Sequence, residues 1–183
     1  MKKFSVKSIV AIGIGAALFF VLSRFVSIPS PVANTNICLQ YGLLAFLATV
    51  FGPVVGALVG FIGHALTDLS WGSPWWSWII ASGGFGLLMG LSVKVLKINE
   101  EEIGKKGLIK FNIAQVVIHL ICWCGVAPVL DILIYSEPVE KLFAQGLMAA
   151  IGNAVTTAIV GSLLCVAYAA TKPKANSLNK EEE

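Results

Sequence analysis

Charged side chains are scarce in this sequence of 183 residues, of which only 13% are Asp, Glu, Lys or Arg. Hydrophobic residues make up 57% of the chain, and its mean hydropathy is +0.85. A soluble domain of this length does not bury so much apolar surface, so the composition predicts a protein dissolved in a lipid bilayer. The net charge of +3 is small and forms no basic stripe interleaved with aromatic residues, which argues against nucleic-acid binding.

Motifs for catalysis, ATP binding and metal binding are missing as well. The sequence contains no G-x-S-x-G, no H-E-x-x-H and no G-x-x-x-x-G-K-[ST]. Of its four cysteines, Cys122 and Cys124 form a C-x-C pair, but no second pair completes a metal site. We therefore expect no metal and no cofactor, and we interpret the thiols as buried and unreactive. These absences favour a binding protein that takes its energy from a partner.

Long apolar stretches predict an all-α membrane protein with six transmembrane helices in one bundle, since a crossing helix needs about 20 apolar residues. Their expected limits are 9–26, 37–51, 53–68, 74–95, 109–130 and 139–170. We expect a single domain over residues 1–171. Residues 172–183 form a charged tail that the composition predicts to be disordered and cytoplasmic.

Two dipeptides set the expected helix limits in the first half of the chain. Gly52-Pro53 divides a long apolar tract into the second and third helices, because proline does not continue a helix interior but suits its first turn. Ser73-Pro74 is expected to provide the N-cap and the first residue of the fourth helix.

The lysines predict the orientation of the bundle. They cluster in residues 2–7, 94–110 and 172–180, and the positive-inside rule places these segments in the cytoplasm. Both termini are then cytoplasmic, as an even number of spans requires, in a multi-pass protein of the plasma membrane. The loops expected on the outside are 27–36, 69–73 and 131–138.

Four of the five tryptophans lie in GHALTDLSWGSPWWSW, residues 63–78, together with His64 and Asp68. This segment is consistent with an aromatic belt at the membrane surface. It is also consistent with the mouth of a pocket that holds a flat polar ring. Further polar residues, such as Arg24 and Asp131, fall near the outer ends of the expected helices. One half of the expected bundle is thus polar and aromatic, and the other half is lined by glycine. This asymmetry favours a pocket open to the outside.

The candidate binding residues form three groups. A cap and its hinge are expected from the amides Asn34, Asn36 and Gln40, and the indole rings of Trp71, Trp75 and Trp76 are expected to stack on the ligand. The polar edge of the ligand is expected to contact His64, Asp68 and Asn153.

Small residues recur at helical spacing in the first span. Ala11 and Gly15 are four residues apart, as are Gly13 and Ala17, and such faces let helices approach closely. The sequence leaves open whether the neighbour is another helix of this chain or a partner protein.

Two segments carry a resemblance to a known family: SVKSIVAIGIGAALFFVLSRFVSIPSPVANTNICLQY, residues 5–41, and FGPVVGALVGFIGHALTDLSWGSPWWSWIIASG, residues 51–83. They resemble the S components of energy-coupling factor (ECF) vitamin transporters, most closely the riboflavin-type group, and the resemblance extends over about residues 5–170. It implies six spans with both termini inside and a vitamin site at the outer side, capped by the loop between the first two spans.

The resemblance also implies partners. In this family a small-residue motif on the first helix docks onto a transmembrane coupling subunit; here the motif is Ala11, Gly13, Gly15 and Ala17. Two cytoplasmic ATPases complete the ABC-type importer, and the loaded S component delivers its vitamin by reorienting in the membrane.

Tryptophans beside neutral amides favour a planar heterocycle, with riboflavin as the first expectation. Hydroxymethylpyrimidine, thiamine precursors and cobalamin remain open, and an anionic vitamin would need more cation than Arg24. Two other classes remain open: a structural membrane protein whose glycine faces serve only packing, and an intramembrane enzyme that uses His64 and Asp68.

Overall fold

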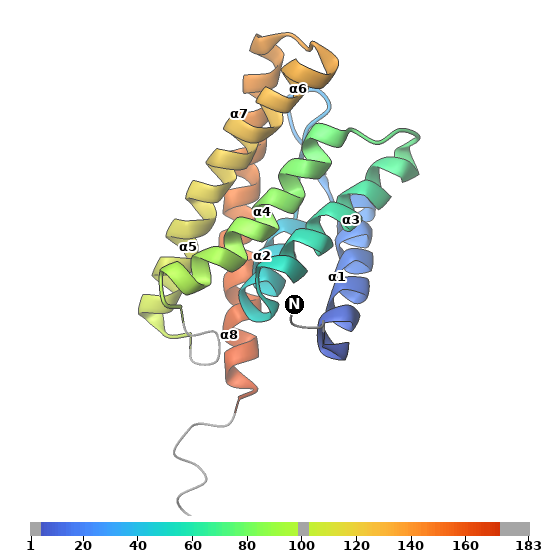
Figure 1. The fold of residues 1–183 in the computed structure, drawn as a ribbon. Coiled ribbons are helices and arrows are strands. Elements are labelled where there is room, and N and C mark those ends of the chain that lie inside the picture. Colours follow the sequence, from blue (N-terminus) through green and yellow to red (C-terminus); the bar gives the residue numbers. More distant parts are fainter. Residues whose placement is uncertain (1–4, 99–102, 173–183) are drawn as a thin grey trace, which may run out of the picture.

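The computed structural model describes residues 5–98 and 103–172, which form a bundle of helices with one short hairpin (Figure 1). Two π-helical segments join α5 to α6 and α7 to α8, so the helices make six continuous rods. This confirms the predicted all-α fold with six helices. The elements are α1 Val6–Phe25, β1 Ile28–Pro29, β2 Asn36–Ile37, α2 Gln40–Phe51, α3 Pro53–Trp71, α4 Trp76–Val95, α5 Lys105–Leu120, η1 Ile121–Val126, α6 Ala127–Tyr135, α7 Val139–Thr156, η2 Thr157–Gly161 and α8 Ser162–Ala170.

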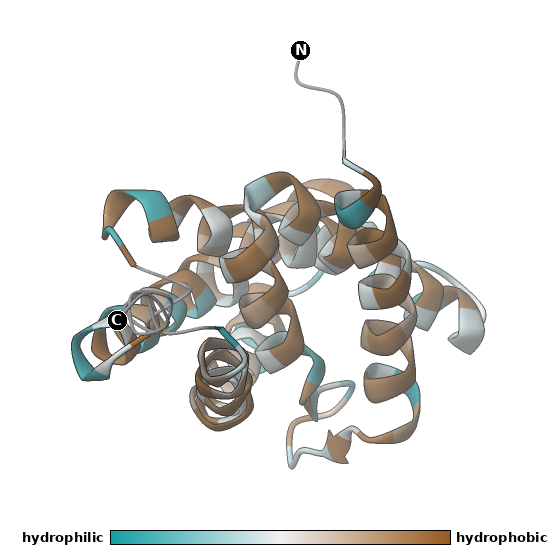
Figure 2. Cartoon of the chain, turned by 90° about the horizontal axis from the view of Figure 1, so that it is seen from below, coloured by the Kyte–Doolittle hydropathy of each residue, from teal (hydrophilic) through white to brown (hydrophobic). Residues whose placement is uncertain are grey.

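Five of the six rods are long and apolar enough to cross a membrane, and the exception is α2 with 12 residues. Nine residues of α2 are buried inside the bundle, so this helix is surrounded by protein and need not match the thickness of the lipid. The other rods expose apolar side chains along their outer faces, and hydrophobic residues dominate the helices in Figure 2.

The last two rods are the longest, with 31 residues in 105–135 and 32 residues in 139–170. At about 1.5 Å per residue each reaches roughly 46–48 Å, well beyond a hydrocarbon core of about 30 Å. At the upper end of Figure 1, α6 and the start of α7 extend past the other helices. Their extra length forms a wall beside the start of α4.

The chain's two described ends lie at the same end of the bundle, where α1 begins and α8 finishes (Figure 1). The opposite end holds the 26–39 segment, the turn between α3 and α4, and the turn between α6 and α7. We call it the tryptophan end, because Trp71, Trp75, Trp76 and Trp78 lie there. Residues 173–183 of the predicted tail 172–183 lie outside the described residues.

The helix limits depart from the sequence expectation by one to five residues at several ends; the first rod begins at Val6, the third ends at Trp71, and the fifth spans 105–135. Two helix starts have a specific structural cause. Helix α2 begins at Gln40 rather than Ile37, because Ile37 pairs with Ile28 in the antiparallel β1–β2 hairpin. Helix α4 begins at Trp76, so the prediction that Ser73-Pro74 starts it is wrong.

Side chains from other helices take over the capping of α4. The backbone N–H of Trp75 donates to Asp68 Oδ2 over 2.9 Å, and the N–H of Trp76 donates to the Tyr135 hydroxyl over 2.9 Å. These partners satisfy amide groups that a helix start leaves free. The break at Gly52-Pro53 is confirmed, because Gly52 has a φ of +89° and α3 starts at Pro53.

Glycines bring α3 and α4 into backbone contact. A Cβ atom at Gly56 would collide with the carbonyl of Gly86, and one at Gly60 with the carbonyl of Ser82. The expected small-residue face of the third helix therefore packs against α4 of the same chain. This close crossing brings the residues at the tops of both helices together at the tryptophan end.

Candidate functional site

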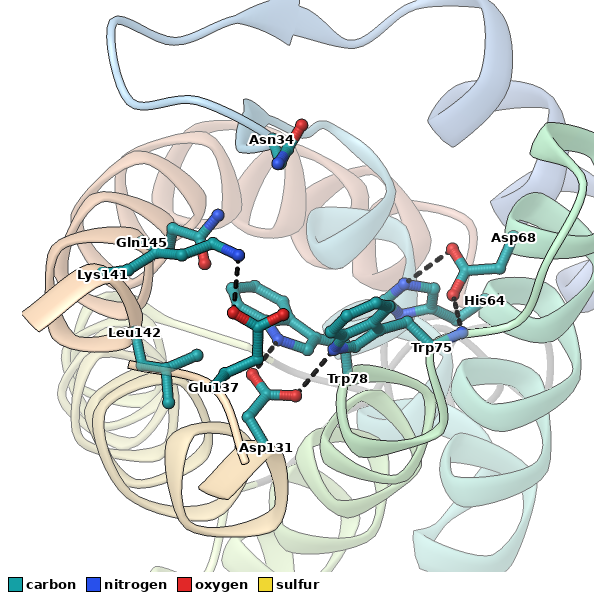
Figure 3. Close-up of a pocket in the computed structure, with 10 residues that line it drawn as sticks. All are labelled: Asn34, His64, Asp68, Trp75, Trp78, Asp131, Glu137, Lys141, Leu142 and Gln145. Carbon is teal, nitrogen blue, oxygen red and sulfur yellow. Dashed lines mark hydrogen bonds and ion pairs between the residues drawn. The ribbon is translucent and has the colours of Figure 1, made fainter. Parts of the chain in front are cut away.

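A cavity with two adjoining lobes opens at the tryptophan end. The first lobe holds about 280 Å³ and the second about 360 Å³, and Asn34, His64, Asp68 and Trp78 line both. Figure 3 shows the first lobe, whose further lining residues are Trp75, Asp131, Glu137, Lys141, Leu142 and Gln145. The second lobe lies under the 33–38 segment and is rich in amides and hydroxyls from Ser23, Thr35, Asn36, Gln40, Tyr41, Thr67 and Asn153. Volumes of this order suit a small organic molecule.

A buried carboxylate holds two indole rings at the wall of the first lobe. Asp131 is 1% exposed. It accepts hydrogen bonds from Trp75 Nε1 at 2.6 Å, from Trp78 Nε1 at 2.8 Å and from the Ser77 hydroxyl. These three donors offset the cost of burying the carboxylate, because hydrogen bonds to an ionised acceptor are stronger than those between neutral groups.

Each of these indoles is also fixed on one ring face. Trp75 stacks on Tyr135 with ring centroids 4.3 Å apart, and Trp78 stacks on Trp123 at 5.3 Å. Because Asp131 holds one edge of each indole and a second aromatic ring covers one face, the two indoles have little freedom to rotate. Because both indoles line the cavity, the site offers a preorganised aromatic surface to a flat ligand.

A second polar network runs from the cavity into the core. His64 Nε2 lies 3.5 Å from Asp68 Oδ1, and His64 Nδ1 lies 2.6 Å from the Ser82 hydroxyl. That hydroxyl is 2.9 Å from the hydroxyl of buried Tyr41. The network connects α3, α4 and α2, so the polar edge of the cavity is held by three helices.

The segment between α1 and α2 is fastened to α7 over the second lobe. Gln145 Nε2 donates to the carbonyl of Ala33 over 2.8 Å. Asn153 Oδ1 accepts the backbone N–H of Cys38 over 3.1 Å, and the Thr156 hydroxyl donates to the carbonyl of Cys38 over 2.7 Å. Burial raises the pKa of the Cys38 thiol to about 11, so this cavity residue stays a neutral thiol near pH 7.

Eight of the nine predicted binding residues line one lobe or both. They are Asn34, Asn36, Gln40, His64, Asp68, Trp71, Trp75 and Asn153.

Trp76 is the exception and lies outside the two lobes. It is 46% exposed and stacks on Phe61 with centroids 6.4 Å apart. Trp75 is the non-helical residue before α4 and lines the cavity, whereas Trp76 is the first residue of the helix and packs on α3. The predicted stacking role of Trp76 is therefore corrected to packing on the outer face of α3.

Trp71 lines the second lobe but remains 64% exposed. The Arg24 guanidinium lies 3.7 Å from its ring centroid, a cation–π contact between the ends of α1 and α3. Arg24 is thus engaged on the ring of Trp71, at the edge of the site.

Several cavity residues were not among the predicted site residues. Trp78 and Asp131 carried usable signals, since Trp78 belongs to the same aromatic segment and Asp131 is a charge beside an apolar stretch. Gln145 also carried a signal, as an amide within an apolar span, whereas Tyr41 carried none. Their positions follow from how α7 and α2 pack beneath the cavity.

The four small residues predicted to bind a partner lie on different faces of α1. Ala11 and Gly15 are buried in the bundle, and a Cβ at Gly15 would fall 2.7 Å from Leu47 Cδ1. Gly13 and Ala17 are exposed, and a Cβ at Gly13 would meet nothing within 4 Å. The structure therefore limits an outward-facing small-residue surface to Gly13 and Ala17, and Gly15 packs internally.

A bundle of apolar helices with a ligand-sized cavity at one end defines a membrane protein that binds a small molecule. Residues 3–170 match the family described as ECF-type riboflavin transporter, S component, and the chain belongs to this family. It is therefore a multi-pass, vitamin-binding subunit of a transporter and not an enzyme.

The chain is also similar to curated relatives and, in its fold, to a solved structure. A UPF0397 protein of Leuconostoc citreum is 51% identical over 179 residues, which cover 97% of this chain and 95% of the relative. A UPF0397 protein of Streptococcus gordonii is 50% identical over 179 residues, with 97% and 96% covered. A solved S component of a bacterial ECF transporter shares the fold with a TM-score of 0.54 and 20% identity, over 88% of this chain and 90% of that one.

Proposed function

We propose that this subunit takes a planar heterocyclic vitamin, riboflavin first among them, from outside the cell. It binds the vitamin at the tryptophan end and delivers it by reorienting on a transmembrane coupling subunit. Two cytoplasmic ATPases drive the cycle. The proposal places the subunit in the plasma membrane with both termini in the cytoplasm.

The observation that carries the proposal is the contrast between the two lobes. The first lobe presents the indoles of Trp75 and Trp78, which suit a flat aromatic ring. The second lobe shares Trp78 and also contains rings of Trp71 and Tyr41, but it is richer in amides and hydroxyls. Those of Asn36, Gln40 and Asn153 suit a chain of hydroxyl groups. Riboflavin joins a flat tricyclic ring to such a chain, so each half of the molecule meets the lobe that suits it.

The other vitamins fit these lobes less well. Hydroxymethylpyrimidine and thiamine precursors are smaller and would fill about one lobe, whereas a corrin macrocycle is larger than cavities of 280 and 360 Å³. Membership of a transporter family leaves a purely structural role and an intramembrane enzyme without support.

The test is a titration of the purified full chain with riboflavin, hydroxymethylpyrimidine, thiamine and cobalamin, monitored by quenching of tryptophan emission. We expect saturable quenching with riboflavin. Trp78→Phe removes the donor to Asp131 and part of the aromatic wall, so we expect its affinity to fall at least tenfold.

Trp76→Phe is the matched control, because Trp76 lies in the same helical turn but outside the lobes. We expect it to bind within twofold of the unaltered chain. If a folded sample shows no saturable quenching with any vitamin, or if the two variants behave alike, the assignment of this cavity is wrong.

A further inference from the structure

A chain of hydrogen bonds behind the cavity fixes how His64 presents its ring. The Tyr41 hydroxyl lies 2.9 Å from the Ser82 hydroxyl, which lies 2.6 Å from His64 Nδ1. Tyr41 and Ser82 are 3% and 0% exposed, and Ser82 lines neither lobe. Ser82 is therefore a buried support that can act on a ligand only through His64.

The carboxylate on the other side of the ring determines which nitrogen of His64 carries a proton. Asp68 Oδ1 lies 3.5 Å from His64 Nε2, and a nitrogen lone pair at that position would repel it. Nε2 therefore carries a proton in the neutral ring, as it does in the protonated ring. In neutral His64, Nδ1 accepts from Ser82, whose oxygen accepts from Tyr41, so each group in the chain has a matching partner.

The contact between His64 and Asp68 leaves both facing atoms available to a ligand. Its 3.5 Å separation is longer than the usual N–H···O distance of about 2.7–3.2 Å. In the part of the chain that the structure describes, neither atom has a further hydrogen-bond partner. The other oxygen of Asp68, Oδ2, accepts the backbone N–H of Trp75 over 2.9 Å, which fixes the carboxylate. The cavity thus presents one N–H donor beside one acceptor, and both are held from behind.

This donor and acceptor lie where the two lobes meet. His64, Asp68 and Trp78 line both lobes. Figure 3 shows His64 and Asp68 to one side of the Trp75 and Trp78 rings. A flat ring that stacks on these indoles therefore has an edge within reach of the pair.

We propose that His64 and Asp68 together recognise a ring edge that carries a hydrogen-bond donor next to an acceptor, and that Ser82 is a positioning residue for this pair. The donor of the ring binds Asp68 Oδ1, and the neighbouring acceptor receives the N–H of His64 Nε2. Two kinds of edge have this pattern. One is a lactam or imide, with N–H beside C=O, and the other is an aminopyrimidine, with an amino group beside a ring nitrogen. The inference rests on the proposed function, because it names the chemical class of ligand for the same cavity.

The experiment compares each vitamin with an analogue that lacks the donor, on the purified full chain in lipid nanodiscs at pH 7.5. Riboflavin is paired with 3-methylriboflavin, and hydroxymethylpyrimidine with its 4-dimethylamino analogue, so a vitamin of either kind tests the rule. Dissociation constants are measured by isothermal titration calorimetry. We expect the methylated analogue to bind at least tenfold more weakly than its parent, because it leaves the carboxylate without a partner.

Asp68→Asn separates a lost hydrogen bond from a steric clash with the added methyl group. The Trp75 N–H retains the amide oxygen, so the NH₂ group takes the place of the acceptor beside His64. The parent vitamin then loses its hydrogen bond and the analogue does not, so we expect the ratio of the two dissociation constants to narrow at least fivefold. Ser70→Ala is the matched control, since Ser70 lies on the same helix, is exposed and lines neither lobe. It should leave the ratio within twofold.

Ser82→Ala tests the support behind the ring. We expect the vitamin to bind at least threefold more weakly, although no lining residue has changed. The specific readout is the ¹H–¹⁵N spectrum of the imidazole rings, in which the Nδ1 resonance of His64 should move because it loses its donor. The chain has two histidines, and the resonances of His119, which contacts Trp123 and Thr157, should stay in place. An unmoved His64 resonance would overturn the role given to Ser82.

The outcomes separate this inference from the proposed function. If a vitamin binds and its methylated analogue binds less than tenfold more weakly, the inference fails and the proposed function stands. If Asp68→Asn narrows the ratio less than fivefold, the methyl group is excluded by its size, and the inference fails as well. If no vitamin binds to a folded sample, the proposed function fails and the inference fails with it.

Discussion

Asp131 illustrates how one residue organises this site. A carboxylate buried near the end of a membrane bundle is costly unless it is fully hydrogen-bonded. Here its two oxygens accept from two indoles and one hydroxyl of the first turn of α4 and the residue before it. The same bonds that keep the charge satisfied also set the angle of the aromatic wall. Asp131 is therefore a positioning residue for Trp75 and Trp78.

Asp131→Asn tests this positioning role. An amide offers one oxygen and an NH₂ group, so it no longer accepts three hydrogen bonds, and one indole N–H loses its partner. We expect the free energy of unfolding to fall by about 1–3 kcal/mol and vitamin affinity to fall at least tenfold. The specific readout is the ¹H–¹⁵N spectrum of the indole groups, in which the Trp75 and Trp78 N–H resonances should both move.

Trp71 provides the internal control for that spectrum, because its ring contacts Arg24 instead of Asp131. Its indole resonance should stay in place. Unchanged Trp75 and Trp78 resonances, together with an affinity within twofold of the unaltered chain, would show that Asp131 does not hold the rings.

At the residue scale eight of the nine predicted residues line the cavity, but twelve further lining residues, among them Trp78 and Asp131, were not predicted. His64 and Asp68 were found because their i, i+4 spacing places them on one helical face, and the structure brings them together at 3.5 Å. Trp76 lies outside the two lobes, because its ring packs on Phe61 of α3. The composition of the aromatic segment is visible in the sequence, but the rotation of α4 decides which rings face inward.

At the scale of elements, the structure divides the small residues of α1 into a pair that packs inside the bundle and a pair that faces outward. Its small residues form two pairs with the same spacing, and periodicity alone does not show which pair faces the bundle. Contact with Leu47 and Val59 buries Gly15, whereas Gly13 faces outward. A coupling subunit approaching α1 would meet the face that carries Gly13 and Ala17.

Gly13→Leu and Gly15→Leu should therefore have opposite effects. Gly13→Leu adds a side chain into open space, so we expect unchanged thermal stability, vitamin affinity within twofold of the unaltered chain, and at least a fivefold loss of co-purified coupling subunit. Gly15→Leu overpacks the contact with α2 and α3, which typically costs about 1–3 kcal/mol of stability. Co-purification from detergent extracts and thermal unfolding are the measurements.

If Gly13→Leu retains the coupling subunit in full, the partner uses another surface of the bundle. If Gly15→Leu keeps the stability of the unaltered chain, the buried position of Gly15 is wrong.

The two π-helical segments, like the short β1–β2 hairpin, were not predicted from the sequence. A π segment inserts one residue into a helix and rotates the residues after it about the helix axis. In η1 this places Trp123 so that its Nε1 donates to His119 Nδ1 over 2.8 Å, while His119 Nε2 lies 3.1 Å from the hydroxyl of Thr157 in η2. Because Nδ1 accepts, neutral His119 carries its proton on Nε2. The ring that supports Trp78 is thus anchored in the middle of the bundle.

At the scale of the whole molecule, the cavity with the aromatic wall lies at one end of the bundle, opposite the end where α1 begins and α8 finishes. Glycine contacts bring α3 and α4 backbone to backbone, while the long rods that contain α6 and α7 extend to form the cavity wall. The two described ends of the chain lie at the end of the bundle opposite the tryptophan end.

A topology experiment tests which end faces the cytoplasm. With the lysine-rich segments inside, green fluorescent protein fused after residue 183 should fluoresce, and alkaline phosphatase fused there should be inactive. Alkaline phosphatase inserted between Val32 and Ala33, in the segment over the cavity, should be active. An active phosphatase at the C-terminus would place the cavity on the cytoplasmic side and exclude uptake from outside as proposed.

The sequence by itself determined the class of this protein. Apolar stretches, proline breaks and lysine clusters depend on local composition and spacing, which is why six helices and a polar, aromatic end were predictable. The tertiary structure decided which side chains meet. Helix rotation, the π segments and the crossing of α3 with α4 turned Trp78 inward and Trp76 outward and brought Asp131 to two indoles. Such contacts join residues more than fifty positions apart, and hydrophobic periodicity carries no information about them, because it reports only which face of each helix avoids water or lipid.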